Sequence, residues 1–166
     1  RNELEEQLVR GINNDEILPY YQPIVDAQSG RVVGAEALMR WHHPQLGTLL
    51  PKDFFPVATE SGWMATLGDI MLHKVCRDLQ ACREEHGHRN LWFSVNLGYE
   101  DLYSQGLADH IAELLREHDL PGDALELEII EDLVNHNGEI VQSQLIALNN
   151  MGIRLAIDDF GKGYSS

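Results

Sequence analysis

Hydrophobic positions in the first half of the chain follow two different periods. Apolar residues recur three to four positions apart over residues 2–13 and again over residues 64–85, which predicts two helices. Between them, residues 18–25 and 31–41 have the apolar and aromatic content of strands, separated only by residues 26–30. Because a connection this short joins antiparallel strands, the pattern predicts a hairpin.

The rest of the chain alternates short strands with helices. Residues 42–51 are a predicted loop, and residues 52–60 a short helix. The pattern then continues as strand, helix, strand, helix and strand, over residues 91–97, 106–118, 125–130, 139–150 and 153–157. Such alternation indicates an α/β fold with a parallel sheet. A doubly wound sheet and the first part of a (β/α) barrel both fit, since a complete barrel needs about 250 residues.

Charge and composition narrow the classes of function. The chain has 166 residues with 12 Lys+Arg and 27 Asp+Glu, so its formal net charge is −15. An acidic domain repels duplex nucleic acid and anionic lipid, so neither DNA nor direct membrane contact is expected. Cys76 and Cys82 fit reduced thiols, and no apolar run is long enough to span a membrane. We therefore expect one cytoplasmic domain, in a parent protein that is either cytosolic or membrane-anchored.

Oxygen-bearing side chains gather at or near the ends of the predicted strands. They are Glu36, Asn96, Glu128 with Glu131 just beyond it, and the adjacent Asp158 and Asp159. Carboxylates beside one another at an apolar strand raise each other's pKa and resist burial, and a divalent cation removes both penalties. Carboxylates with one amide favour Mg²⁺ or Mn²⁺ over zinc. The alternative is a solvated strand face, with helix N-caps at the Asp pair and at the Asn.

Several motifs follow one another from residue 21 to the end of the chain. They read YQPI at 21–24, EALMRW at 36–41, SVNL at 94–97, LELEIIE at 125–131 and DDFGKGYSS at 158–166. His43-Pro44 and Gly47 stand between the second and third motifs. The order and spacing resemble those of the EAL-domain cyclic-di-GMP phosphodiesterases, whose name comes from the second motif.

The resemblance implies a TIM-like (β/α) barrel with an antiparallel first strand, incomplete in this chain. It implies an EAL domain over residues 17–166, truncated before its last strands. Residues 1–16 would then be a helix or linker from an upstream sensory or diguanylate-cyclase-like module. The family hydrolyses cyclic di-GMP to linear pGpG in bacterial signalling and uses Mg²⁺ or Mn²⁺, and two ions are expected here. A homodimer is also expected.

The resemblance further implies a role for each candidate residue. Glu36, Asn96, Glu128 and Asp158 match metal ligands, Asp159 matches a ligand of a second metal, Arg40 matches a phosphate contact and Gln22 a substrate-side amide. Glu36 and Glu131 are the catalytic assignments, with Glu131 steadying the loop that follows the last strand. The implied chemistry is two-metal hydrolysis, in which the ions hold the phosphoryl oxygens and activate a water.

Departures from the family pattern leave other functions open. The sequence stops after the GYSS letters, whereas the family continues through three more strands with a lysine, a glutamate ligand and a glutamine. Thr59, Gly98, Ile130 and Lys162 replace the usual Glu, Ser, Thr and a small residue. A non-catalytic cyclic-di-GMP receptor or regulatory module is therefore the alternative, and a second protomer is one way to complete the barrel. Without the family, the residues support only a divalent-metal hydrolase.

Overall fold

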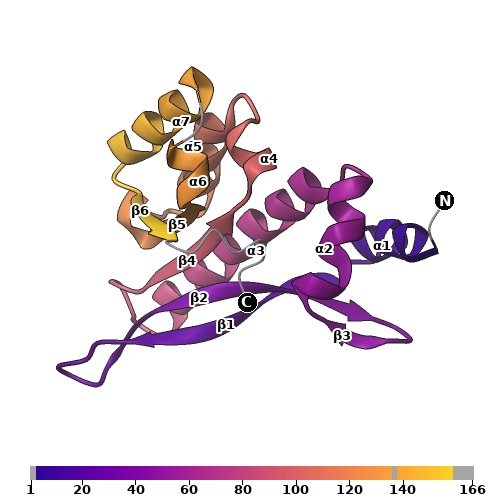
Figure 1. Cartoon of the computed structure of the whole chain (residues 1–166). Coiled ribbons are helices and arrows are strands. Elements are labelled where there is room, and N and C mark those ends of the chain that lie inside the picture. Colours follow the sequence, from indigo (N-terminus) through magenta and orange to yellow (C-terminus); the bar gives the residue numbers. More distant parts are fainter. Residues whose placement is uncertain (1–2, 136–137, 159–166) are drawn as a thin grey trace.

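A mixed β-sheet organises the chain in a computed structural model that describes residues 3–135 and 138–158. The strand order is β1-β2-β4-β5-β6, with β3 paired to β2 at the side (Figure 1). The strands span β1 (Ile17–Val25), β2 (Val32–His43), β3 (Gly47–Leu49), β4 (Trp92–Leu97), β5 (Leu125–Ile130) and β6 (Arg154–Asp158). β1 is antiparallel to β2, whereas β2, β4, β5 and β6 are parallel, as the alternation of elements predicts.

Helices connect the parallel strands. The longer helices are α1 (Glu3–Asn13), α2 (Pro51–Glu60), α3 (Met64–Glu85), α5 (Leu107–Glu117) and α7 (Glu139–Asn150). Two short helices, α4 (Tyr99–Leu102) and α6 (Glu131–Asn135), follow β4 and β5, and a 3₁₀ turn (Gly122–Ala124) precedes β5. Each helix and strand expected from periodicity is present, with its ends within about two residues of the prediction.

The predicted loop at residues 42–51 is wrong in part. β2 runs on to His43, and β3 folds back against it as a second antiparallel hairpin. The buried His43 ring holds this turn, because its Nδ1 accepts hydrogen bonds from the backbone N–H groups of Gln45 (3.1 Å) and Leu46 (3.0 Å). Gly47 follows with φ +79°, a conformation that favours glycine. A three-residue strand is too short to show an alternating pattern. For the same reason α4 and α6 are too short to show a helical pattern.

One face of the sheet is apolar and covered by helices. Alternate residues of β4 and β5 share one buried core with residues of α3, α5 and α7. The buried set includes Phe93, Val95, Leu97, Leu125, Leu127, Ile129, Val75, Leu79, Ile111, Leu114, Val141 and Leu148. Because strand side chains alternate between faces, the intervening residues point to the opposite face, where the candidate chemistry lies.

A second core cluster closes one end of the β1–β2 hairpin. Trp41 and Phe54 are fully buried there with Leu8 of α1, and their rings meet edge to face at 5.6 Å. The Trp41 indole Nε1–H donates to the Glu16 Oε1 atom at 3.0 Å. Helix α1 therefore packs on the sheet, and the assignment of residues 1–16 to an upstream module stays a prediction.

Two other sequence-based expectations concern the membrane and the thiols. Within the described residues, no helix combines the length and apolarity needed to cross a membrane. Cys76 is buried and Cys82 half-buried on α3, and both are free thiols, as expected. Burial raises the pKa of Cys76 to about 11, so its thiol stays protonated and unreactive at neutral pH.

Candidate active site

Strand register brings the predicted ligands together on the polar face of the sheet. Gln22 of β1 lies opposite Glu36 of β2, and Asn96 of β4 lies opposite Glu128 of β5. Asp158, the last residue of β6, pairs with Ile130, two positions beyond Glu128 on the same face. These side chains, which come from five neighbouring strands, therefore form one oxygen-rich row.

Glu36 and Asn96 are in direct contact although 60 residues separate them. The Asn96 Nδ2 amide donates to the Glu36 Oε2 atom at 3.4 Å, a long hydrogen bond between half-buried side chains. This contact fixes the amide so that its Oδ1 atom is left as a donor for a cation. The N-cap role that the sequence left open for Asn96 is not needed, because Gly98 precedes α4.

The Glu128 carboxyl is partly buried and lies near other negative charges. Partial burial, together with the negative charges of Glu36 and Glu126, raises its pKa to about 7. Glu36 on β2 and the Glu126 and Glu128 side chains on β5 thus place three mutually repelling carboxylates on one face of the sheet. A divalent cation would relieve this repulsion, so the donor set fits Mg²⁺ or Mn²⁺ held by Glu36, Asn96, Glu128 and Asp158.

Two further observations concern the predicted metal ligands. Asp159 lies outside the described residues. Within the described ranges, the His, Cys, Asp and Glu ligand atoms that approach within 4.8 Å as a group belong to Asp69, His73 and His110, which lie on α3 and α5.

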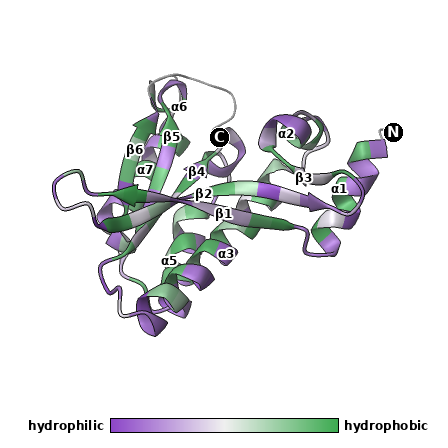
Figure 2. Ribbon diagram, turned by 90° about the horizontal axis from the view of Figure 1, so that it is seen from below, coloured by the Kyte–Doolittle hydropathy of each residue, from purple (hydrophilic) through white to green (hydrophobic). Residues whose placement is uncertain are grey.

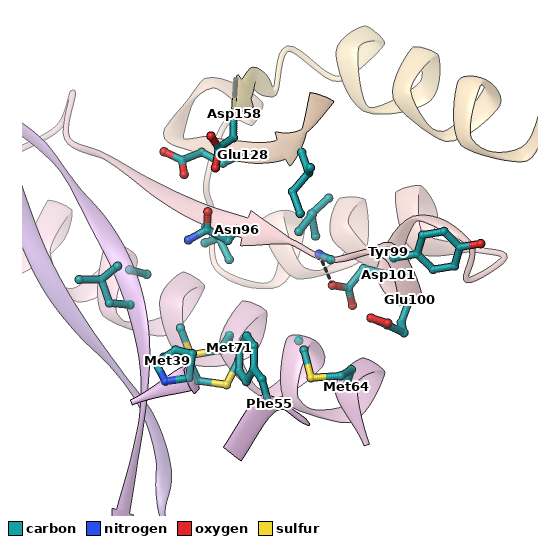
Figure 3. Close-up of a pocket in the computed structure, with 18 of the residues that line it drawn as sticks. Met39, Phe55, Met64, Met71, Asn96, Tyr99, Glu100, Asp101, Glu128 and Asp158 are labelled. Atoms are coloured by element: carbon teal, nitrogen blue, oxygen red, sulfur yellow. Dashed lines mark hydrogen bonds between the residues drawn. The ribbon is translucent and has the colours of Figure 1, made fainter. Parts of the chain in front are cut away.

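A cavity of about 390 Å³ lies beside the oxygen-rich row. Asn96, Glu128 and Asp158 stand at its polar end, while thioether and aromatic side chains form the opposite wall (Figure 3). That wall consists of Met39, Phe55, Met64 and Met71, from β2, α2 and α3. The cavity therefore combines charged oxygen donors with a broad apolar surface, a combination suited to an anionic ligand that carries planar rings.

Residues that depart from the family pattern also line this cavity. Thr59, Gly98 and Ile130 all contribute to its wall. Lys162 lies outside the described residues. These departures change the cavity lining and leave the oxygen donors of Glu36, Asn96 and Glu128 intact.

The sequence did not single out Asp101, which shapes the cavity from α4. Its Oδ2 atom accepts the backbone N–H of Gly98 at 2.9 Å, shown as the dashed line in Figure 3. Burial, together with the nearby charges of Glu100 and Asp69, raises its pKa to about 6. Gly68 of α3 leaves room for the carboxylate, since a Cβ there would lie 2.5 Å from Asp101 Oδ1. The sequence signal that could have indicated this contact is Asp101 three residues after Gly98, the spacing of a helix N-terminal capping pattern.

The remaining candidates are placed at the margins of the site. Arg40 is half-buried on the same face of β2 as Glu36, where its Nη1–H donates to the Met39 carbonyl at 2.8 Å. Its guanidinium also lies 5.9 Å from the centre of the Tyr20 ring. Gln22 is exposed on β1, and Glu131 is exposed at the start of α6. The loop that Glu131 is expected to steady falls outside the described residues.

Sequence comparison identifies the family. The chain matches the EAL domain family model over residues 3–166 and belongs to that family. It is 38% identical over its whole length to an uncharacterized signaling protein of Caulobacter vibrioides, and 36% identical to an uncharacterized protein of Mycobacterium tuberculosis. The chain spans 20% of the first relative and 54% of the second.

Comparison with solved structures supports the same family and decides the fold. The PaMucR phosphodiesterase in complex with c-di-GMP superimposes with a TM-score of 0.89 and 33% identity, over 99% of this chain and 66% of that one. The EAL enzyme Bd1971 bound to cAMP and cyclic di-GMP gives a TM-score of 0.86 and 27% identity, over 98% and 45%. EAL domains are TIM-like barrels, so the described sheet is part of a barrel with an antiparallel first strand, as predicted.

Proposed function

We propose that the chain is a metal-dependent phosphodiesterase that hydrolyses cyclic di-GMP to linear pGpG. The observation that carries this proposal is the row of Glu36, Asn96, Glu128 and Asp158 across parallel strands beside a cavity. A cytoplasmic location, a homodimer and an upstream signalling module belong to the same proposal. Mg²⁺ or Mn²⁺, with two ions when Asp159 contributes, would supply charge neutralisation and an activated water at this row.

The polar end of the cavity holds the reacting phosphate. Glu36, Glu128 and Asp158 provide the negative charge that retains the cations, and Asn96 orients Glu36 through their contact. Glu128, whose pKa is raised to about 7, would be held in its ionised form by a divalent cation at this row. Arg40, on the same face of β2 as Glu36, offers a planar donor fork that suits a phosphate. Gln22, opposite Glu36, offers an amide on the same side.

The apolar wall accommodates the rest of the nucleotide. Phe55 and the neighbouring thioethers of Met64 and Met71 form a surface on which a planar purine can pack. An apolar wall that excludes water also lowers the local dielectric constant, so interactions with the phosphate are stronger than in water. Binding energy from the base thus positions the phosphate at the carboxylate row.

Turnover of cyclic di-GMP by the chain and by two matched variants tests the proposal. Glu36→Gln removes one charge from the row and is expected to reduce pGpG formation about a hundredfold or more. Glu100→Gln makes the same chemical change in the same cavity, away from the row, and is expected to keep activity within about threefold. Chromatography of the products with Mg²⁺ or Mn²⁺, and with a chelator, measures both effects. Equal loss in the two variants would overturn the assignment of Glu36.

Binding without hydrolysis is the second candidate function. The altered cavity lining at Thr59, Gly98 and Ile130 favours it, because these residues change the wall that a bound nucleotide would contact. Calorimetric titration with cyclic di-GMP distinguishes the two. Binding without pGpG supports a receptor, and absence of both binding and product refutes both functions.

The phosphate contact has its own test. Arg40→Ala is expected to weaken cyclic-di-GMP binding about tenfold or more, the cost of a lost charge-assisted hydrogen bond. Arg31→Ala removes the same charge from the exposed β1–β2 turn and should leave the affinity unchanged. Equal affinities for both variants would exclude the phosphate role of Arg40.

A further inference from the structure

A second group of metal-ligating side chains lies on the helices, apart from the carboxylate row. Asp69 and His73 are one turn apart on α3, so both project from the same side of that helix. His110 comes from α5, which packs beside α3 on the helical face of the sheet (Figure 2). Nothing in the proposed phosphodiesterase chemistry uses these residues.

The three ligand atoms already stand close to the spacing of a metal site. The His73 Nε2 atom lies 3.4 Å from Asp69 Oδ1, and the His110 Nε2 atom lies 2.5 Å from the same oxygen. Zinc–nitrogen bonds of about 2.0–2.1 Å in a tetrahedron separate ligand atoms by about 3.3 Å. The Asp69–His73 pair therefore matches a tetrahedral edge, and the Asp69–His110 pair needs a movement of under about 1 Å. All three residues offer ligand atoms within 4.8 Å of one another.

Both imidazole rings place Nε2 near the Asp69 carboxylate, and all three side chains are open to solvent. The ring centroids are 5.3 Å apart, and the side chains of Asp69, His73 and His110 are 50%, 47% and 41% exposed. An ion can reach the group from water, and water can fill a remaining coordination position. A neighbouring cavity of about 410 Å³, lined in part by Asp69 and His73, leaves space beside them.

The donor chemistry differs from that of the carboxylate row. Two imidazole nitrogens with one carboxylate oxygen suit Zn²⁺ and other late first-row metals, whereas Mg²⁺ requires oxygen ligands. We propose that Asp69, His73 and His110 form a zinc-binding clip that joins α3 to α5. The ion would replace the hydrogen bond between Asp69 and His110, with any proton on His110 Nε2 passing to water, and would tie together two helices that cover the sheet.

Zinc titration against a chromophoric chelator tests the clip in the intact chain. Saturating Mg²⁺ is kept in every titration, and Glu36→Gln serves as a second background in which the carboxylate row is weakened. The wild-type chain is expected to show a zinc-binding class that His73→Ala, His110→Ala and Asp69→Asn each lose in both backgrounds. His86→Ala changes an exposed histidine beyond the end of α3 and should retain it.

Thermal unfolding gives an independent readout that does not involve turnover. Because the clip links two helices of the folded state only, Zn²⁺ is expected to raise the unfolding midpoint of the wild-type chain and of His86→Ala. It should not raise the midpoint of His73→Ala or His110→Ala. Zinc binding that survives in both of these variants, or no zinc class in the wild-type chain, would overturn the proposal and leave a metal-free hydrogen-bonded contact.

Discussion

The buried carboxyl of Asp101 should make the stability of this chain fall as pH rises through 6. Its pKa is raised from the usual 3.8 to about 6, mainly because burial penalises the charged form. The unfolded chain therefore releases this proton at lower pH than the folded chain does. The stabilising contribution of the protonated form is complete below pH 3.8 and is lost as pH rises through about 6.

Asp101→Asn removes the ionisation and keeps the acceptor for the Gly98 N–H. One pKa unit corresponds to 1.36 kcal/mol, so a rise from 3.8 to about 6 corresponds to about 3 kcal/mol at most. The amide stays neutral at every pH. Relative to the wild-type chain, the variant should therefore gain up to about 3 kcal/mol of unfolding free energy between pH 4 and pH 7.

Urea unfolding at intervals from pH 4 to pH 7 measures this difference, with the effects of the other carboxylates cancelling between the two chains. Asp123→Asn, at an exposed position in the 3₁₀ turn, is the control and should show a difference that does not change with pH. A pH-independent difference for Asp101→Asn, or one that shrinks as pH rises, would refute the inference that burial raises the pKa of Asp101.

Packing predictions can be checked by the same unfolding measurements. Gly122→Ala should destabilise the chain strongly, because an added Cβ would lie 1.9 Å from the Met151 carbonyl oxygen, whereas Gly138→Ala meets open space and should change little. Phe54→Ala should cost about 3–5 kcal/mol because the ring is fully buried. Leu46→Ala, at a side chain that is 61% exposed, should cost under about 0.5 kcal/mol. Equal unfolding midpoints within either pair would contradict the packing described here.

Part of the candidate site followed from sequence alone. Alternation places Glu126 and Glu128 on one face of β5. The observed register pairs Asn96 with Glu128 and so brings the amide to that face as well. What periodicity did not supply was the cavity wall. Phe55 and Met64 approach the carboxylate row only because α2 and α3 fold over that end of the sheet.

Local patterns determined the long elements, the antiparallel first pair and the strands that carry the oxygen donors. They did so because helices and strands impose different periods on hydrophobic residues. Short elements such as β3 and α4 contain too few residues to show a period, so the His43 turn and the Asp101 contact required the structure.

Relations between distant segments were decided by tertiary structure. Barrel and doubly wound sheets share the same alternation, and only the arrangement of the sheet in space, with its solved relatives, separates them. Asp69 and His110 are 41 residues apart and no motif joins them. Their contact exists because packing brings the two helices together, and the pKa of Asp101 is raised because packing removes water from its carboxyl. Neither effect can be predicted from the local sequence.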